Sequence, residues 1–216
     1  MISEAEYLAD IPNLHTWDGG VTWNSGGFFE PELSALIRLV RACGPGAEVV
    51  ETGAGNSTVS LLLAGAARVQ AICPDQDLFD RITAYCDAKG IDRQGLTPIV
   101  GWSEDVLPKL ADRMEAEGRR ADLVLIDGGH GWPTVFVDFC YMFRMLRPGG
   151  WLVIDDIQIY GIKELARMLV EDPRVERVET LRKTLIFRKK VDVRYLPDWY
   201  DQPYIFRQTD AHDTAL

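Results

Sequence analysis

Short apolar segments recur along the chain, separated by stretches whose apolar residues repeat with helical spacing. Each segment is nearly continuously apolar, as in parallel strands that are buried on both faces of a sheet. Parallel strands joined by helices imply right-handed crossover connections. The pattern therefore predicts five parallel strands, at residues 47–52, 67–73, 96–101, 121–127 and 151–156.

The stretches between and after these strands predict helices at residues 57–63, 78–89, 105–117, 134–146 and 161–171. Two further segments, "RVERVETL" and "KTLIFRKK", follow with almost no residues between them, which favours an antiparallel hairpin. We therefore expect an α/β fold, a Rossmann-like three-layer sandwich. Its sheet would be mostly parallel and seven-stranded, with a C-terminal antiparallel hairpin.

Both ends of the chain depart from this alternation. Residues 28–43 predict an amphipathic helix, but the segment before them is rich in Gly and Trp. After the hairpin, "VRYLPDWYDQPYIF" carries five aromatic residues and two prolines and is too irregular to predict a helix. We expect an N-terminal extension or lid at 1–27, a main domain at 28–191 and an aromatic tail at 192–216. Each end either packs on the chain's own surface or acts as a lid or exchanged arm, and the tail could mediate a homo-oligomer.

Composition narrows the function classes. Thirty-three acidic residues against 23 Lys and Arg give a net charge of −10, which argues against nucleic acid and anionic membranes as partners. The four cysteines have no metal-binding spacing, and the N-terminal residues have no signal-peptide pattern. Because no segment has the roughly 18 consecutive apolar residues of a membrane helix, we expect a cytoplasmic protein.

Two of the predicted strands end on acidic residues. Asp127 ends one, and Asp155 with Asp156 ends the next, 28 positions later. One helix and one returning strand bring the chain back to its starting level over such a spacing. Three carboxylates that meet there need a cation or protons, and all-oxygen ligands suit Mg²⁺ or Ca²⁺. The alternative without metal is that Asp156 caps the next helix and Asp127 binds a loop amide.

The first predicted strand runs into a glycine turn, "VVETGAGNSTVS", and then a helix. Such a turn leaves backbone amides free to bind a ligand carboxylate. It lacks the third glycine of a GxGxxG turn, because position 58 is Thr. The turn alone is only a weak indication of a ligand site. The acids at the neighbouring strand ends strengthen this interpretation.

On these residues the chain resembles class I S-adenosylmethionine (SAM)-dependent methyltransferases, over residues 26–190. Within this class it resembles the metal-dependent catechol and caffeoyl-CoA O-methyltransferase group, in which an acid ends the fourth strand and a pair, usually Asp then Asn, ends the fifth. Here Asp127, Asp155 and Asp156 stand at those metal-ligand positions, so the site is one charge more negative. "DGGH" is also similar to a bacterial branch of methyltransferases that act on secondary metabolites.

The resemblance also implies a SAM site. The second strand of such enzymes usually ends on an acid that binds the ribose, but this chain has Cys73 there. Asp75, two residues later, either takes this role or is a turn residue. Glu51 would bind the methionine amino group, Ser57 its carboxylate and Ser103 with Glu104 the adenine. The residues expected to bind SAM are Glu51, Gly53, Gly55, Ser57, Asp75, Ser103, Glu104 and Asp127.

His130 stands where catechol-type enzymes have a catalytic lysine, three residues after the first metal acid. An imidazole is suited to accept a proton near neutral pH. We therefore expect His130 to act as the base, with Asp127 beside it, although a surface His near a helix start would look the same.

The function predicted from these residues is SAM-dependent methyl transfer to a hydroxyl of a small molecule, aided by Mg²⁺ or another divalent cation. One alternative is a methyltransferase without metal, in which His130 or Asp127 orients the acceptor. A second is a catalytically silent SAM-fold binding module. A nicotinamide dehydrogenase is disfavoured by the missing third glycine and by Cys73 at the end of the second strand.

Overall fold

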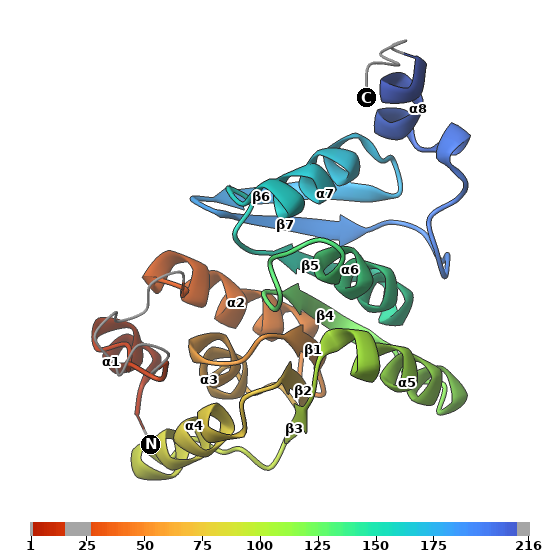
Figure 1. Ribbon diagram of the computed structural model, residues 1–216. Coiled ribbons are helices and arrows are strands. Elements are labelled where there is room, and N and C mark those ends of the chain that lie inside the picture. Colours follow the sequence, from red (N-terminus) through yellow and green to blue (C-terminus); the bar gives the residue numbers. More distant parts are fainter. Residues whose placement is uncertain (1, 16–26, 211–216) are drawn as a thin grey trace.

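The computed structural model describes residues 2–15 and 27–210, which fold around a seven-stranded sheet (Figure 1). The strands lie in the order β3-β2-β1-β4-β5-β7-β6. Strands β1 to β5 are parallel, whereas β7 runs antiparallel to both β5 and β6. The predicted fold class is therefore confirmed. The strands are β1 Glu48–Thr52, β2 Arg68–Cys73, β3 Leu96–Val100, β4 Ala121–Ile126, β5 Leu146–Ile154, β6 Val175–Leu181 and β7 Thr184–Lys189.

Helices cover both faces of the sheet. Successive strand residues point to opposite faces, so each strand contributes side chains to both layers of packing. On one face, Val49 and Leu123 pack with residues of the first four helices, whereas on the other Val50 and Val124 pack with residues of the next three. The helices are α1 Glu4–Ala9, α2 Glu30–Cys43, α3 Asn56–Leu63, α4 Gln76–Lys89, α5 Ser103–Ala116, α6 Thr134–Met145, α7 Tyr160–Glu171 and α8 Pro203–Asp210.

The strand register brings the predicted acids together. Ile126 of β4 pairs with Ile154 of β5, so Asp127 and Asp155 leave the sheet at the same level. Their backbones are fixed there, since Asp127 N donates to Thr52 O at 3.1 Å and Asp155 N donates to Ile126 O at 3.1 Å. The strand order reverses beside them, between β1 and β4, which is where open α/β sheets bind ligands.

The C-terminal tail contains a helix that was not predicted. Its aromatic and proline content suggested irregular chain, but α8 begins at Pro203. A proline is favourable at the first helical position, where its missing N–H costs nothing. The helix is tied to α7 by Tyr204 Oη, which donates to Glu164 at 2.9 Å, and by an Arg207–Glu171 ion pair of 2.6 Å. The expected homo-oligomer through this tail stays a prediction.

The N-terminal segment packs on the domain. Tyr7 of α1 is fully buried, and its hydroxyl donates to Asn56 O, at the start of α3, at 2.8 Å. Asn56 in turn donates to Pro12 O at 3.0 Å. The lid predicted around Trp17 and Trp23 lies outside the described residues. Within residues 2–15 and 27–210, no helix combines the length and apolarity needed to cross a bilayer.

Candidate active site

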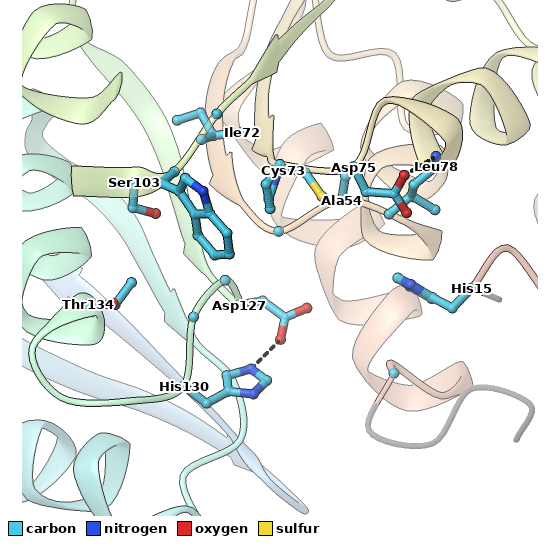
Figure 2. A pocket seen from close by; sticks show the side chains of 17 residues that line it. His15, Ala54, Ile72, Cys73, Asp75, Leu78, Ser103, Asp127, His130 and Thr134 are labelled. Carbon is cyan, nitrogen blue, oxygen red and sulfur yellow. Dashed lines mark hydrogen bonds and ion pairs between the residues drawn. The ribbon is translucent and has the colours of Figure 1, made fainter. Parts of the chain in front are cut away.

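A cavity of about 340 Å³ opens at the strand ends beside this reversal (Figure 2). Its walls come from the ends of β1, β2 and β4, from the start of α5 and from the N-terminal segment. The structure thus brings part of the predicted site together in one pocket. The predicted site residues that line it are Gly53, Asp75, Ser103, Asp127 and His130.

Gly53 allows the closest approach between β1 and β4. Its φ of +86° lies in the left-handed region, which side chains rarely adopt. A Cβ atom there would lie 2.3 Å from the carbonyl oxygen of Asp127. The turn therefore requires glycine for its conformation and for the space beside Asp127.

Glu51 and Ser57 lie beneath the pocket rather than on its wall. Glu51 is fully buried and accepts hydrogen bonds from Ser57 Oγ at 2.8 Å and from Thr58 Oγ1 at 2.5 Å. Burial raises the pKa of Glu51 to about 8, against the opposing effect of these two hydrogen bonds. The three side chains hold the glycine turn from below, and the direct SAM contacts of Glu51 and Ser57 stay predictions.

The two proposed nucleoside-binding regions differ in exposure. Ser103 is buried at the first position of α5, whereas the neighbouring Glu104 is exposed and accepts a hydrogen bond from Thr134 Oγ1. Asp75 caps α4 by accepting from Leu78 N at 3.1 Å, and it pairs with Arg81 at 3.3 Å. It is therefore a helix cap that also lines the pocket, and its role at the ribose stays a prediction.

The acids at the strand ends form a compact cluster with His130. One side-chain atom each from Asp127, His130 and Asp156 lies within 4.8 Å of the other two. His130 Nε2 is 3.3 Å from Asp156 Oδ2 and 3.7 Å from Asp127 Oδ1, and it makes no hydrogen bond of good geometry. Asp156 has φ of +57°, a strained conformation typical of functional sites. It does not cap the next helix, since Ile159 precedes α7.

Asp155 is held differently from the arrangement predicted from sequence. Its Oδ1 accepts from Thr184 Oγ1, and its Oδ2 pairs with Lys183 Nζ at 2.8 Å. Lys183 also pairs with Asp156 Oδ1 at 2.7 Å. The sequence argument did not count this lysine, because it belongs to the hairpin 27 residues further along the chain. Asp155 is thus outside the cluster of converging ligand atoms, and its role as a metal ligand stays a prediction.

The electrostatics of the cluster favour a shared proton or a cation. Burial raises the pKa of Asp127 to about 7, the contact with His130 opposes this, and the nearby charge of Asp155 adds to it. The same contact with Asp127 raises the pKa of His130, and the charges of Asp127, Asp156 and Asp155 reinforce the effect. The carboxylates around His130 therefore favour its protonated form.

His15 is a pocket residue that sequence reasoning missed. It lies against Gly55, where an added Cβ would be 2.7 Å from His15 Nε2. The segment is anchored by Arg81, whose Nε donates to Leu14 O at 2.6 Å. Burial lowers the pKa of His15, and the charge of Arg81 lowers it further. Sequence gave no signal for this placement, because the contact joins residues 40 positions apart.

A buried carboxylate behind the pocket makes stability depend on pH. Burial raises the pKa of Asp138 to about 6, while the hydroxyls of Ser103 and Thr52 partly offset this. The folded state therefore binds a proton more readily than the unfolded state, and stability falls as pH rises from about 4 to about 6. We expect Asp138→Asn to stabilise the protein at pH 8 by roughly 2 to 3 kcal/mol.

Urea unfolding at pH 8 and at pH 4 tests this expectation. Most of the gain from Asp138→Asn should disappear at the lower pH, where Asp138 is protonated in the folded state and about half protonated in the unfolded state. Asp192→Asn, at an exposed ion pair with Arg120, is the control and should show no such pH dependence. An equal effect of Asp138→Asn at both pH values would contradict the assignment.

Residues 50–157, half of the chain, match the model of a methyltransferase domain family. The chain belongs to this methyltransferase family. The match runs from β1 to the residues after β5, and so includes the glycine turn and the acid cluster. No curated protein matches the methyltransferase. The resemblance drawn from the sequence is therefore confirmed at the level of the family.

Solved structures share the fold of this methyltransferase at low sequence identity. An O-methyltransferase from Bacillus cereus, in complex with S-adenosylhomocysteine (SAH), has a TM-score of 0.61 at 18% identity, covering 77% of this chain and 84% of that one. A putative caffeoyl-CoA O-methyltransferase from Staphylococcus aureus gives 0.59 at 12%, covering 74% and 83%. The SAH-bound Podospora anserina methyltransferase PaMTH1 gives 0.58 at 15%, covering 76% and 80%.

Proposed function

We propose that this methyltransferase moves the methyl group of SAM to a hydroxyl of a small molecule, and that a divalent cation such as Mg²⁺ assists. The observation that carries the proposal is the convergence of Asp127, His130 and Asp156 at a pocket lined by the glycine turn. Two methyltransferases of similar fold were solved in complex with SAH, which supports SAM as the donor. The O-methyltransferase from Bacillus cereus and the putative caffeoyl-CoA O-methyltransferase from Staphylococcus aureus support an oxygen acceptor.

The residues of the cluster fit a dication. Asp127 and Asp156 offer carboxylate oxygens, which are donors that suit a hard dication, and burial disfavours leaving these carboxylates uncompensated. Asp127 and Asp156 would hold the ion. A bound dication would lower the pKa of the acceptor hydroxyl and orient it.

Each protein residue has a defined task in this proposal. The glycine turn and Ser103 position SAM in the pocket, with Asp75 at the ribose and Glu51 beneath the methionine end. His130, whose Nε2 faces both acids, takes the proton from the hydroxyl. Enclosure of the donor and acceptor excludes water during an in-line transfer.

A methyltransferase without metal is the second candidate. It is favoured by one observation, the pairing of Lys183 with Asp155 and Asp156, which already compensates part of the negative charge. His130 and Asp127 would then orient the acceptor by themselves.

Release of SAH from SAM in the presence of a panel of phenols and catechols separates the two candidates. The first predicts turnover that is lost with a chelator and restored by Mg²⁺. Turnover that a chelator leaves unchanged would favour the second, and methyl transfer only to nitrogen or carbon acceptors would contradict both.

We expect His15→Ala to weaken SAH binding about fivefold, because it removes a polar pocket wall worth roughly 1 kcal/mol. The segment itself should stay in place, since Tyr7 and Leu14 anchor it independently of the imidazole. Titration calorimetry with SAH measures the change. Lys89→Ala, on the outer end of α4, is the control, and an unchanged affinity in His15→Ala would show that the imidazole does not contact the cofactor.

A further inference from the structure

The hairpin between β6 and β7 delivers a lysine to the acid cluster. Arg182 and Lys183 form the turn of this hairpin, and the turn is fixed to the chain after the acids because Ile157 N donates to Lys183 O at 3.0 Å. The Lys183 side chain is only 13% exposed. Its Nζ lies 5.7 Å from the centre of the buried Phe28 ring. The ammonium is therefore built into the site rather than placed at its rim.

Lys183 contacts the two adjacent acids in different ways. Asp155 is engaged at both oxygens, by Lys183 and by Thr184. Asp156 offers only Oδ1 to Lys183, while Oδ2 remains directed at His130. The lysine therefore withdraws Asp155 from the ligand cluster and leaves one oxygen of Asp156 in it.

The charges of the site also balance around this lysine. Asp155 and Asp156 place two carboxylates side by side after β5, and both of them pair with Lys183. One ammonium beside the pair cancels one carboxylate. A dication that binds between Asp127 and Asp156 must then do so beside a fixed positive charge, which opposes its binding.

We propose that Lys183 is a resident counter-cation that compensates Asp156 and limits the affinity of the acid cluster for a divalent metal. This inference rests on the proposed metal site. Removing the ammonium exposes two carboxylates to the ion and frees Asp155 to join it. Lys183 is in this sense a positioning residue, because it acts through Asp155 and Asp156.

The test is Mn²⁺ binding to the full chain saturated with SAH, measured from the free-ion signal in electron paramagnetic resonance. We expect Lys183→Met to bind Mn²⁺ at least tenfold more tightly than wild type. Lys183→Arg keeps the charge and should stay within threefold of wild type. Lys190→Met is the matched control, since Lys190 is exposed beyond the other end of β7 and should leave Mn²⁺ affinity unchanged.

The double variant Asp155→Asn with Lys183→Met removes one charge of each sign and keeps Asp127 and Asp156, the two proposed ligands. It should bind Mn²⁺ within threefold of wild type, and it keeps the inference testable if Lys183→Met fails to fold. A tenfold weaker affinity in the double variant would contradict charge compensation. As a second readout, Mn²⁺ should raise the unfolding temperature of Lys183→Met more than that of wild type, because the ion replaces the lost counter-charge.

The outcomes separate this inference from the proposed function. If wild type binds Mn²⁺ and Lys183→Met binds it equally or more weakly, the role of Lys183 is wrong and the metal site stands. If only Lys183→Met binds Mn²⁺, the role of Lys183 is supported and the wild-type enzyme works without metal. If neither protein binds Mn²⁺, both proposals fail.

Discussion

Gly53→Ala is expected to weaken SAH binding by roughly 100-fold, because a methyl group at this position has no room. The added Cβ would lie 2.3 Å from the carbonyl oxygen of Asp127, and this neighbour is backbone that cannot rotate away. Relieving the clash must separate β1 from β4 at the floor of the pocket. Titration calorimetry with SAH measures the loss, with circular dichroism to show that the variant remains folded.

Gly65→Ala is the matched control. Gly65 has the same φ of +86° as Gly53, but nothing lies within 4 Å of an added Cβ. Both variants therefore lose about 1 kcal/mol of stability to the left-handed backbone, and only Gly53→Ala should lose SAH affinity. Equal SAH binding in the two variants would show that the turn beside Asp127 does not hold the cofactor.

Asp127→Asn is expected to lower methyl transfer at least about 100-fold, because it removes a carboxylate charge of the cluster that lies 3.7 Å from His130 Nε2. Asn has nearly the same shape, so the pocket wall is preserved and SAH affinity should stay within about threefold. Release of SAH with an acceptor identified in the panel gives the rate, and calorimetry gives the affinity.

Asp192→Asn is the control for this variant, since Asp192 is an exposed acid that pairs with Arg120 and is absent from the pocket wall. It should leave rate and affinity unchanged. Equal losses of SAH affinity and rate in Asp127→Asn would place Asp127 in cofactor binding alone, and an unchanged rate would remove it from the chemistry.

The parallel sheet could be predicted because each strand is a short apolar run that is buried on both faces. Consecutive residues such as Val49 and Val50 pack in the cores on opposite faces of the sheet, so most strand positions are apolar. That Asp127 and Asp155 leave the sheet at the same level followed from the same regularity, since one crossover helix and one strand return the chain to its starting level. The register of Ile126 with Ile154 confirms this level.

The tail helix and the role of Lys183 could not be predicted in the same way. Helix α8 depends on contacts with α7, such as Tyr204 to Glu164, rather than on its own sequence pattern. Lys183 lies in a hairpin turn whose sequence predicts only an exposed charged residue. Its pairing with Asp155 and Asp156 follows from the antiparallel return of β7 beside β5, which places the turn over the strand ends.

Some pocket residues could be predicted from the sequence, whereas others depend on tertiary contacts. Gly53 and Asp127 follow directly from strand ends, so local patterns indicated them, whereas Ser103, at the start of α5, was named through the resemblance. His15 reaches the pocket through tertiary contacts of the N-terminal segment, and the sequence carried no local sign of them. Glu51 and Ser57 were found by resemblance, and the structure adds that they bind each other beneath the turn.

The most direct test of the account is a crystal structure of the protein grown with SAH and Mn²⁺, with anomalous differences measured to locate the ion. The account predicts SAH in the cavity beside Gly53 and Ser103, and one Mn²⁺ peak within about 2.5 Å of oxygens of Asp127 and Asp156. SAH bound elsewhere would contradict the cofactor site. SAH in place with no peak at the acid cluster would contradict the metal-assisted chemistry.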